Sequence, residues 1–220
     1  MFDESHTLHN VDFRFFDKVA NLASEYCVQL AKEFEAKKIS ELQFATQEIC
    51  APAFSEIFAI RELLKLHYLH TSELLLRPLL ERISTICYLR KSDESVLRSW
   101  QSGWKDCKTR PSPDSRIAMM DELKDPFTGA IAPMDQAYRD LIRNYREGLH
   151  SLVHGDRAGS YRSRVVDGAG KTYFAAGPNP YDADSESRIA LVAASLTSYL
   201  LQEINILFPS LEVYFLGEAS

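Results

Sequence analysis

Large apolar side chains recur at steps of three and four residues along the first third of the chain, which is the spacing of one helix face. The pattern predicts one helix over roughly 11–37 and a second from 41 to about 66. Ser40 and Gln43 have the residue types and spacing of a capping box, so the second helix should begin directly after Ser40. Pro52 lies inside this helix and predicts a kink or a division there.

The segment over 71–90 is apolar on most sides, as expected for a helix at the centre of a bundle. Thr71 or Ser72 is predicted to cap it, because hydroxyl side chains accept hydrogen bonds from the first backbone amides of a helix. Ser92 and Asp93 have the same property and predict the start of a shorter fourth helix.

Three more helices are predicted in the second half of the chain, over 114–123, 134–153 and 186–207. Asp184 or Ser185 is expected to cap the last of them. The connections between these helices contain proline and glycine, which are typical of irregular segments. The chain is therefore predicted to be helical along most of its length.

The pattern changes between the last two of these helices. Two short β-like runs flank Asp167 and Gly168, which is compatible with a small hairpin near 160–176 or with an ordered loop. Neither an internal repeat nor a linker-like stretch divides the sequence. The fold prediction is all-α: a single domain over 1–220, built as a bundle of about six or seven helices with a small β-hairpin near 160–176.

Composition and charge narrow the function classes. Hydrophobic residues make up 45% and charged residues 25% of the chain, as in an ordinary folded protein. The formal net charge of −6 argues against an overall basic surface for nucleic acid, but leaves a local basic face open. The sequence shows no secretory signal, membrane span, metal-type cysteine spacing or nucleotide-binding glycine loop. We therefore expect a cytoplasmic protein with reduced thiols, no cofactor and no membrane contact.

Five polar side chains share one face of the helix predicted over 134–153. His150 and His154 are four residues apart, and Glu147 joins their face from three residues before His150. Arg143 lies two turns before His150, and Arg146 lies two turns before His154. These residues are the candidate site, and a solvated helix face is the alternative interpretation.

A second polar element interrupts the apolar segment over 71–90. Arg77 and Glu81 are four residues apart among leucines, where a charge pair is costly unless it is paired or functional. One interpretation is a buried structural salt bridge. In the other, the pair faces His154 or Asp156 across the bundle and tunes them. The second interpretation places Arg77, Glu81 and Asp156 in one polar network.

The sequence RPLLE at 77–81 and the sequence HSLVHGD at 150–156 occur together in this chain. In that combination the chain resembles an uncharacterised family of bacterial helical proteins, described only as a domain of unknown function. The resemblance covers roughly Leu74 to Asp156. It implies a helical fold and says little about function.

The chain also resembles, more loosely, the HEPN superfamily of helical bundles. Many of its members carry an arginine, then four to six residues, then a histidine, and act as metal-independent ribonucleases in toxins and phage defence. Arg143 and His150 take these positions, with six residues between them and Asn144 directly after the arginine. The resemblance implies a site shared across a homodimer. His150 would be the acid-base group and Arg143 the clamp on the phosphate, with Arg146 and His154 assisting.

Two other functions fit the same residues. The first, which we favour, is a non-catalytic binding or regulatory module of a toxin–antitoxin or phage-defence system, since polar networks in helical bundles are more often structural than catalytic. Its partner would be a protein, whereas the ribonuclease would bind RNA. The second is a metal-binding bundle, with Glu147, His150 and His154 as ligands at helical spacing. His67 and His70 could add ligands, but we expect both to be exposed at a helix end.

Overall fold

The computed structural model describes residues 10–36, 38–105, 111–127, 130, 164–166, 172–174, 178 and 182–214. Within these residues, six α-helices form a bundle with a short 3-10 helix and a two-stranded hairpin. The helices are α2 (Val11–Ala36), α3 (Glu41–Lys65), α4 (Leu69–Lys91), α5 (Glu94–Gln101), α6 (Pro113–Ile117), α9 (Ala183–Leu207) and the 3-10 helix η1 (Pro209–Tyr214). The all-α prediction is confirmed.

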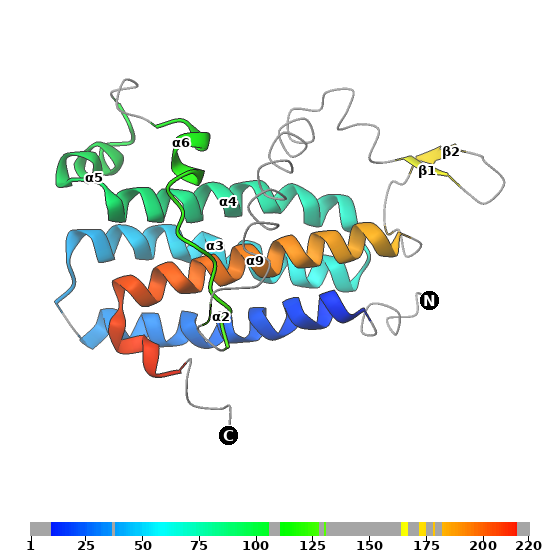
Figure 1. Ribbon diagram of the computed structural model, residues 1–220, viewed down its shortest axis with the longest axis horizontal. Helices are drawn as coiled ribbons and strands as arrows, with labels where there is room; N and C mark the ends of the chain where they lie inside the picture. Colours follow the sequence, from blue (N-terminus) through cyan, green and yellow to red (C-terminus); the bar gives the residue numbers. More distant parts are fainter. Residues whose placement is uncertain are drawn as a thin grey trace.

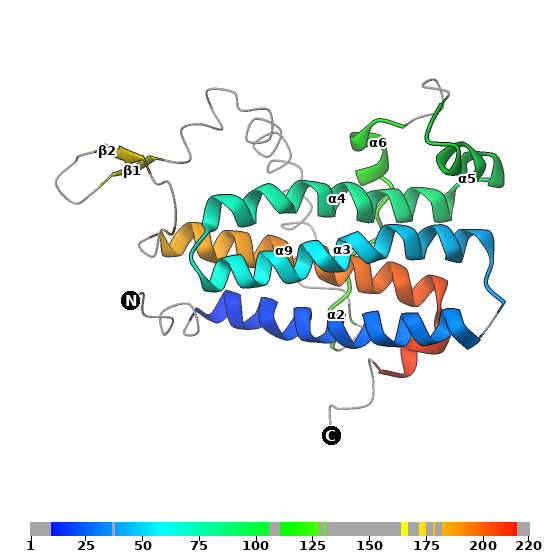
Figure 2. The ribbon, with the colours of Figure 1, turned by 180° about the vertical axis from the view of Figure 1, so that it is seen from behind.

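The four long helices enclose one core. Helix α2 contacts α3 and α9, and α4 contacts the same two helices. Figures 1 and 2 show α4 above and α2 below, with α3 and α9 on opposite sides between them. Helices α2, α4 and α9 run in one direction and α3 runs in the other. The short helices α5 and α6 lie at the end of the bundle where α4 finishes (Figure 1).

The core consists of the apolar faces that the sequence pattern predicts. Its largest fully buried side chains come from all four long helices, and burying each one stabilises the fold by about 1.5–3 kcal/mol. They are Phe13, Phe16, Ile57, Ile60, Leu64, Leu76, Leu79, Ile83, Ile86, Ile189 and Leu196. Helix α4 contributes four of these, more than any other helix, as expected of a central helix.

Local signals predicted two helix starts correctly. The Ser40 hydroxyl accepts a hydrogen bond from the Gln43 amide, and the Gln43 side chain accepts one from the Ser40 amide, so the capping box is present. Asp93 caps α5 through the amides of Ser95 and Val96. Pro52 does not divide α3, because one missing backbone donor is tolerated in a helix packed on both sides.

Other boundaries differ from the predictions. Helix α4 begins at Leu69, and Ser72 lies inside it with its hydroxyl donating to the Tyr68 carbonyl. Helix α9 is capped by Asp182, which accepts from the Ser185 amide, so the predicted caps at Asp184 or Ser185 are wrong. A serine can satisfy a carbonyl within a helix as well as cap one, and the sequence alone does not separate the two.

The remaining predicted elements have mixed outcomes. The helix predicted over 114–123 is shorter, because α6 ends at Ile117 and an extended segment follows. The small hairpin is present as β1 (Arg164–Val166) and β2 (Thr172–Phe174), which pair antiparallel. The helix predicted over 134–153 lies outside the described residues.

Helix α9 is apolar enough to raise the question of a membrane. By length and composition it could cross one, but 83% of its most apolar window is buried in the bundle. The central helix of a folded bundle passes the same test. The predictions of a cytoplasmic location and of no membrane contact therefore stay predictions.

Candidate functional site

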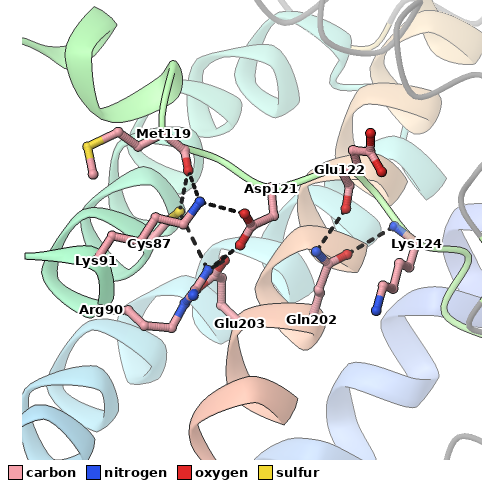
Figure 3. Close-up of polar contacts among 9 residues, drawn as sticks. All are labelled: Cys87, Arg90, Lys91, Met119, Asp121, Glu122, Lys124, Gln202 and Glu203. Atoms are coloured by element: carbon pink, nitrogen blue, oxygen red, sulfur yellow. Dashed lines mark hydrogen bonds and ion pairs between the residues drawn. The ribbon is translucent and has the colours of Figure 1, made fainter.

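A charged cluster joins α4, α9 and the chain after α6, and it is drawn in Figure 3. We call it the Arg90 cluster; its members are Cys87, Arg90, Lys91, Asp121 and Glu203. The helical spacing of the first three brings them together at the end of α4. Glu203 lies opposite them near the end of α9, and Asp121 lies in the extended segment that crosses both helices.

Arg90 sits between the two carboxylates. Its Nε donates to Glu203 Oε2 at 2.6 Å and its Nη2 donates to Glu203 Oε1 at 3.0 Å, which is a two-point ion pair. The same Nη2 also donates to Asp121 Oδ2. Lys91 Nζ donates to the other Asp121 oxygen at 2.5 Å and to the Met119 carbonyl at 2.5 Å. Two cations thus balance two carboxylates.

Hydrogen bonds within the cluster shift the pKa values of Arg90 and Asp121. The hydrogen bond to Glu203 raises the pKa of Arg90 above its ordinary value, against the opposing effect of burial. Burial acts to raise the pKa of Asp121, but hydrogen bonds from Lys91 and Arg90 outweigh it and leave that pKa below its ordinary value. Glu203 is only 4% exposed, so its charge depends on the arginine for compensation.

The Cys87 thiol has a raised pKa in this cluster, which makes it unreactive at neutral pH. Burial, and then the negative charge of Glu203, raise its pKa to about 12. The thiol is therefore protonated at neutral pH, and Sγ donates to the Met119 carbonyl at 3.1 Å. Because the thiolate is the reactive form of cysteine, this thiol is unsuited to act as a nucleophile at neutral pH.

By distance alone, three members of the cluster could hold a cation. Ligand atoms of Cys87, Asp121 and Glu203 lie within 4.8 Å of one another. However, Arg90 already donates to both carboxylates, so a cation would have to displace the guanidinium. The arrangement fits a structural ion-pair cluster better than a metal centre.

The ion pairs of the Arg90 cluster hold the chain that follows α6 against the bundle, through Asp121. Beside it, Gln202 accepts from the Lys124 amide and donates to the Glu122 carbonyl, both at 2.9 Å (Figure 3). Met120 and Leu123 of the same segment are buried against the core. We call residues 113–124 the α6 segment. Polar and apolar contacts together hold it across α4 and α9.

None of the residues predicted from the sequence belongs to this cluster, although the sequence contains one signal for it. Glu203 is the only charged residue between Ile189 and Leu207. A carboxylate in such an apolar helix is costly to bury unless a cation pairs with it. That reasoning predicts a partner for Glu203 but does not identify Arg90, which is 113 residues away in the sequence.

A second polar cluster lies at the opposite end of the bundle, where α3 turns into α4. His67 is 2% exposed, and its Nδ1 lies 3.4 Å from Glu186 Oε2 at the start of α9. The other Glu186 oxygen accepts from the Asn10 amide group at 3.3 Å. We call Asn10, His67 and Glu186 the His67 cluster. The expectation that His67 is exposed is wrong, whereas His70 is exposed as expected.

The backbone explains why His67 turns inward. Its φ of 58° is left-handed, its amide donates to the Leu64 carbonyl, and the Tyr68 amide donates to the Leu63 carbonyl. This is the Schellman arrangement at a helix end, where glycine is the usual residue. A non-glycine residue in this conformation costs on the order of 1 kcal/mol. The buried contact with Glu186 offsets that cost.

Arg77 and Glu81 form an ion pair, but not a buried one. Arg77 Nε lies 3.0 Å from Glu81 Oε1, and the two side chains are 18% and 36% exposed. The prediction of a buried pair is wrong, because both side chains keep part of their surface exposed, as long charged side chains can do while they cover apolar surface. A role for the pair in tuning a site stays a prediction.

The other predicted site residues lie outside the described residues. They are Arg143, Arg146, Glu147, His150, His154 and Asp156. The ribonuclease site, the metal site and the part of the polar network that reaches Asp156 therefore stay predictions. Comparison with protein-family models, with curated proteins and with solved structures gave no match.

Proposed function

We propose that this protein is a non-catalytic binding module, in which the helical bundle is a rigid scaffold for contact with a protein partner. The observation that carries the proposal is the balanced charge of the Arg90 cluster. Two cations are held by two carboxylates, and a thiol beside them is protonated. No member of this cluster is available as a base or nucleophile near neutral pH.

Ion pairs between helices support the same conclusion. Arg61 of α3 pairs with Asp17 of α2 at 2.6 Å, and Arg82 of α4 pairs with Glu56 of α3 at 2.8 Å. Each pair links two neighbouring helices at one register. Charged groups used in this way favour a scaffold with a single arrangement of its helices.

The other described cysteines also suit a scaffold. Burial raises the pKa of the Cys50 thiol. It also raises the pKa of the Cys27 thiol, which is less buried. Both thiols are therefore protonated near neutral pH, like that of Cys87. Cysteine-based catalysis at these three positions is disfavoured, because the reactive form is the thiolate.

The proposal is tested by incubating purified protein with single-stranded and hairpin RNA in the presence of EDTA. Wild type, Arg143→Ala and His150→Ala are run in parallel, and circular dichroism checks that all three are folded. We expect intact RNA in every reaction. Cleavage by wild type that both variants lose would overturn the proposal in favour of a HEPN-like ribonuclease.

The metal alternative has its own test. The protein is purified without chelators and its metal content is measured, followed by the same measurement on Glu147→Ala and His150→Ala. A binding module of the proposed kind carries no stoichiometric metal. One metal ion per chain in wild type that both variants lose would establish the metal-binding bundle instead.

A further inference from the structure

Two hollows lie one after the other between the first turns of α3 and helix α5. One hollow lies between Ser40–Leu42 and the start of α5, at Asp93, Glu94 and Leu97. The next lies between Phe44 and Glu48 of α3 and the end of α5, at Trp100, Gln101 and Gly103. The two hollows have volumes of about 470 and 540 Å³. Spaces of this size accept side chains of a ligand rather than single waters. We call them together the α3–α5 groove, at the α5 end of the bundle in Figure 1.

The floor of the groove is apolar and aromatic. Leu97 is buried beneath it, and Trp100 packs partly against the core. Phe44 is 48% exposed, which is unusual for a phenylalanine on a helix whose other face is core. The second tryptophan is used elsewhere, because the Trp104 ring packs against Tyr88 with centroids 6.4 Å apart. Phe44 and Trp100 are thus the aromatic surface that the groove offers.

The rim of the groove is acidic. Glu41, Phe44 and Glu48 recur at three- and four-residue steps, so both carboxylates flank the exposed phenylalanine on one face of α3. Both glutamates are exposed, and the charge of Glu41 contributes, after the hydrogen bond to Glu94, to the raised pKa of Arg98 on α5. On the opposite rim, Asp93 caps α5 and Glu94 pairs with Arg98 at 2.8 Å.

These features select a class of ligand. Carboxylates around an aromatic floor attract a cation, and an aromatic face can also receive the charge of an arginine or lysine. Nucleic acid and anionic membranes carry the wrong sign for this rim. An amphipathic helix or strand that alternates apolar and basic side chains satisfies both the floor and the rim.

We propose that the α3–α5 groove binds a basic, amphipathic segment of a partner protein, with Phe44 and Trp100 contacting its apolar side chains and Glu41 and Glu48 pairing with its lysines or arginines. This inference rests on the proposed function, since it names the surface and the partner chemistry of that binding module. The groove is a recognition surface, and it does no chemistry.

The test measures binding of a synthetic amphipathic leucine–lysine peptide by tryptophan fluorescence. The protein carries Trp104→Phe, so that Trp100 alone reports on the groove. A leucine–glutamate peptide with the same apolar positions is the ligand control. We expect the lysine peptide to shift the Trp100 emission saturably and the glutamate peptide to leave it unchanged.

Matched variants locate the binding. Glu41→Gln with Glu48→Gln should weaken the lysine peptide about tenfold, because two rim charges are lost. Glu25→Gln with Glu35→Gln removes the same charge from exposed positions of α2 and should change the affinity by less than about twofold. Phe44→Ala should also weaken binding, whereas Val28→Ala, at a side chain 53% exposed on α2, should not.

Equal weakening by both charge variants, binding of both peptides, or no binding of the lysine peptide would overturn the groove proposal. These outcomes are separate from the RNA test. Loss of peptide binding with intact RNA would refute the groove alone, whereas RNA cleavage that depends on Arg143 and His150 would refute the binding module itself.

Discussion

The two ends of the bundle each bury a carboxylate of α9, but they compensate it in different ways. Glu203 receives a two-point ion pair from Arg90, and this pair raises the pKa of the guanidinium above its ordinary value. Glu186 meets a histidine and an asparagine at longer distances of 3.4 and 3.3 Å. The two carboxylates are about 25 Å apart along the helix.

The two clusters differ because each one stabilises a different feature of the bundle. The Arg90 cluster is a set of ion pairs that holds the α6 segment on α4 and α9. The His67 cluster instead accompanies a turn, since His67 occupies the left-handed position at which α3 ends. Helix α9 thus serves two purposes with two carboxylates. Glu186 pairs with the histidine of the turn between α3 and α4, and Glu203 pairs with the arginine that holds the α6 segment.

The largest effect should follow Glu203→Ala. The variant leaves Arg90 partly buried beside Asp121 alone, and removing one partner of a buried pair costs about 3–5 kcal/mol. The free energy of unfolding is measured with urea for this variant and for Glu122→Ala, an exposed glutamate of the same region. A loss below about 1 kcal/mol for Glu203→Ala would show that the ion pair between Arg90 and Glu203 does not stabilise the fold.

An intermediate effect is expected for His67→Gly. Glycine removes the left-handed strain of about 1 kcal/mol, but it also removes the donor that faces a buried carboxylate, which costs about 1–3 kcal/mol. We expect a net destabilisation of about 0–2 kcal/mol in urea unfolding. A more stable glycine variant would mean that His67 serves only the turn and that Glu186 does not depend on it.

The thiol of Cys87 predicts a loss of stability in alkali. Its folded pKa of about 12 lies above the ordinary value of 9.0. Stability from the protonated thiol is therefore fully present below pH 9.0 and is lost as the pH rises toward 12. The urea midpoint should fall less steeply between pH 9 and pH 10 in Cys87→Ala than in wild type, each normalised to its value at pH 7. Parallel pH curves for the two proteins would show that ionisation of Cys87 does not destabilise the fold.

The smallest effect is expected for Glu81→Ala. Its pair with Arg77 is partly exposed and spans one helix turn, and pairs of this kind contribute about 0.2–1 kcal/mol. Urea unfolding should show a loss below about 1 kcal/mol, with Glu81→Gln close to it. A loss of several kcal/mol would place the pair in a network that depends on its charge.

The sequence was most informative where the structural cause is local. The capping box at Ser40 and the apolar faces of the long helices depend on neighbours within two turns, and both are confirmed. The Arg90 cluster joins residues 31 and 113 positions apart, and such pairs follow from helix packing that a single sequence does not specify. Arg77 shows the same limit, because which side of an apolar helix faces outward depends on its neighbours.

Expression in a bacterial host tests the central claim, that this bundle binds rather than cleaves, most directly. Growth and total RNA are compared for wild type, Arg143→Ala and His150→Ala, with protein levels matched by immunoblot. We expect equal growth and intact RNA for all three proteins. Slow growth with RNA breakdown in the wild-type culture alone would contradict it and assign the protein to catalysis.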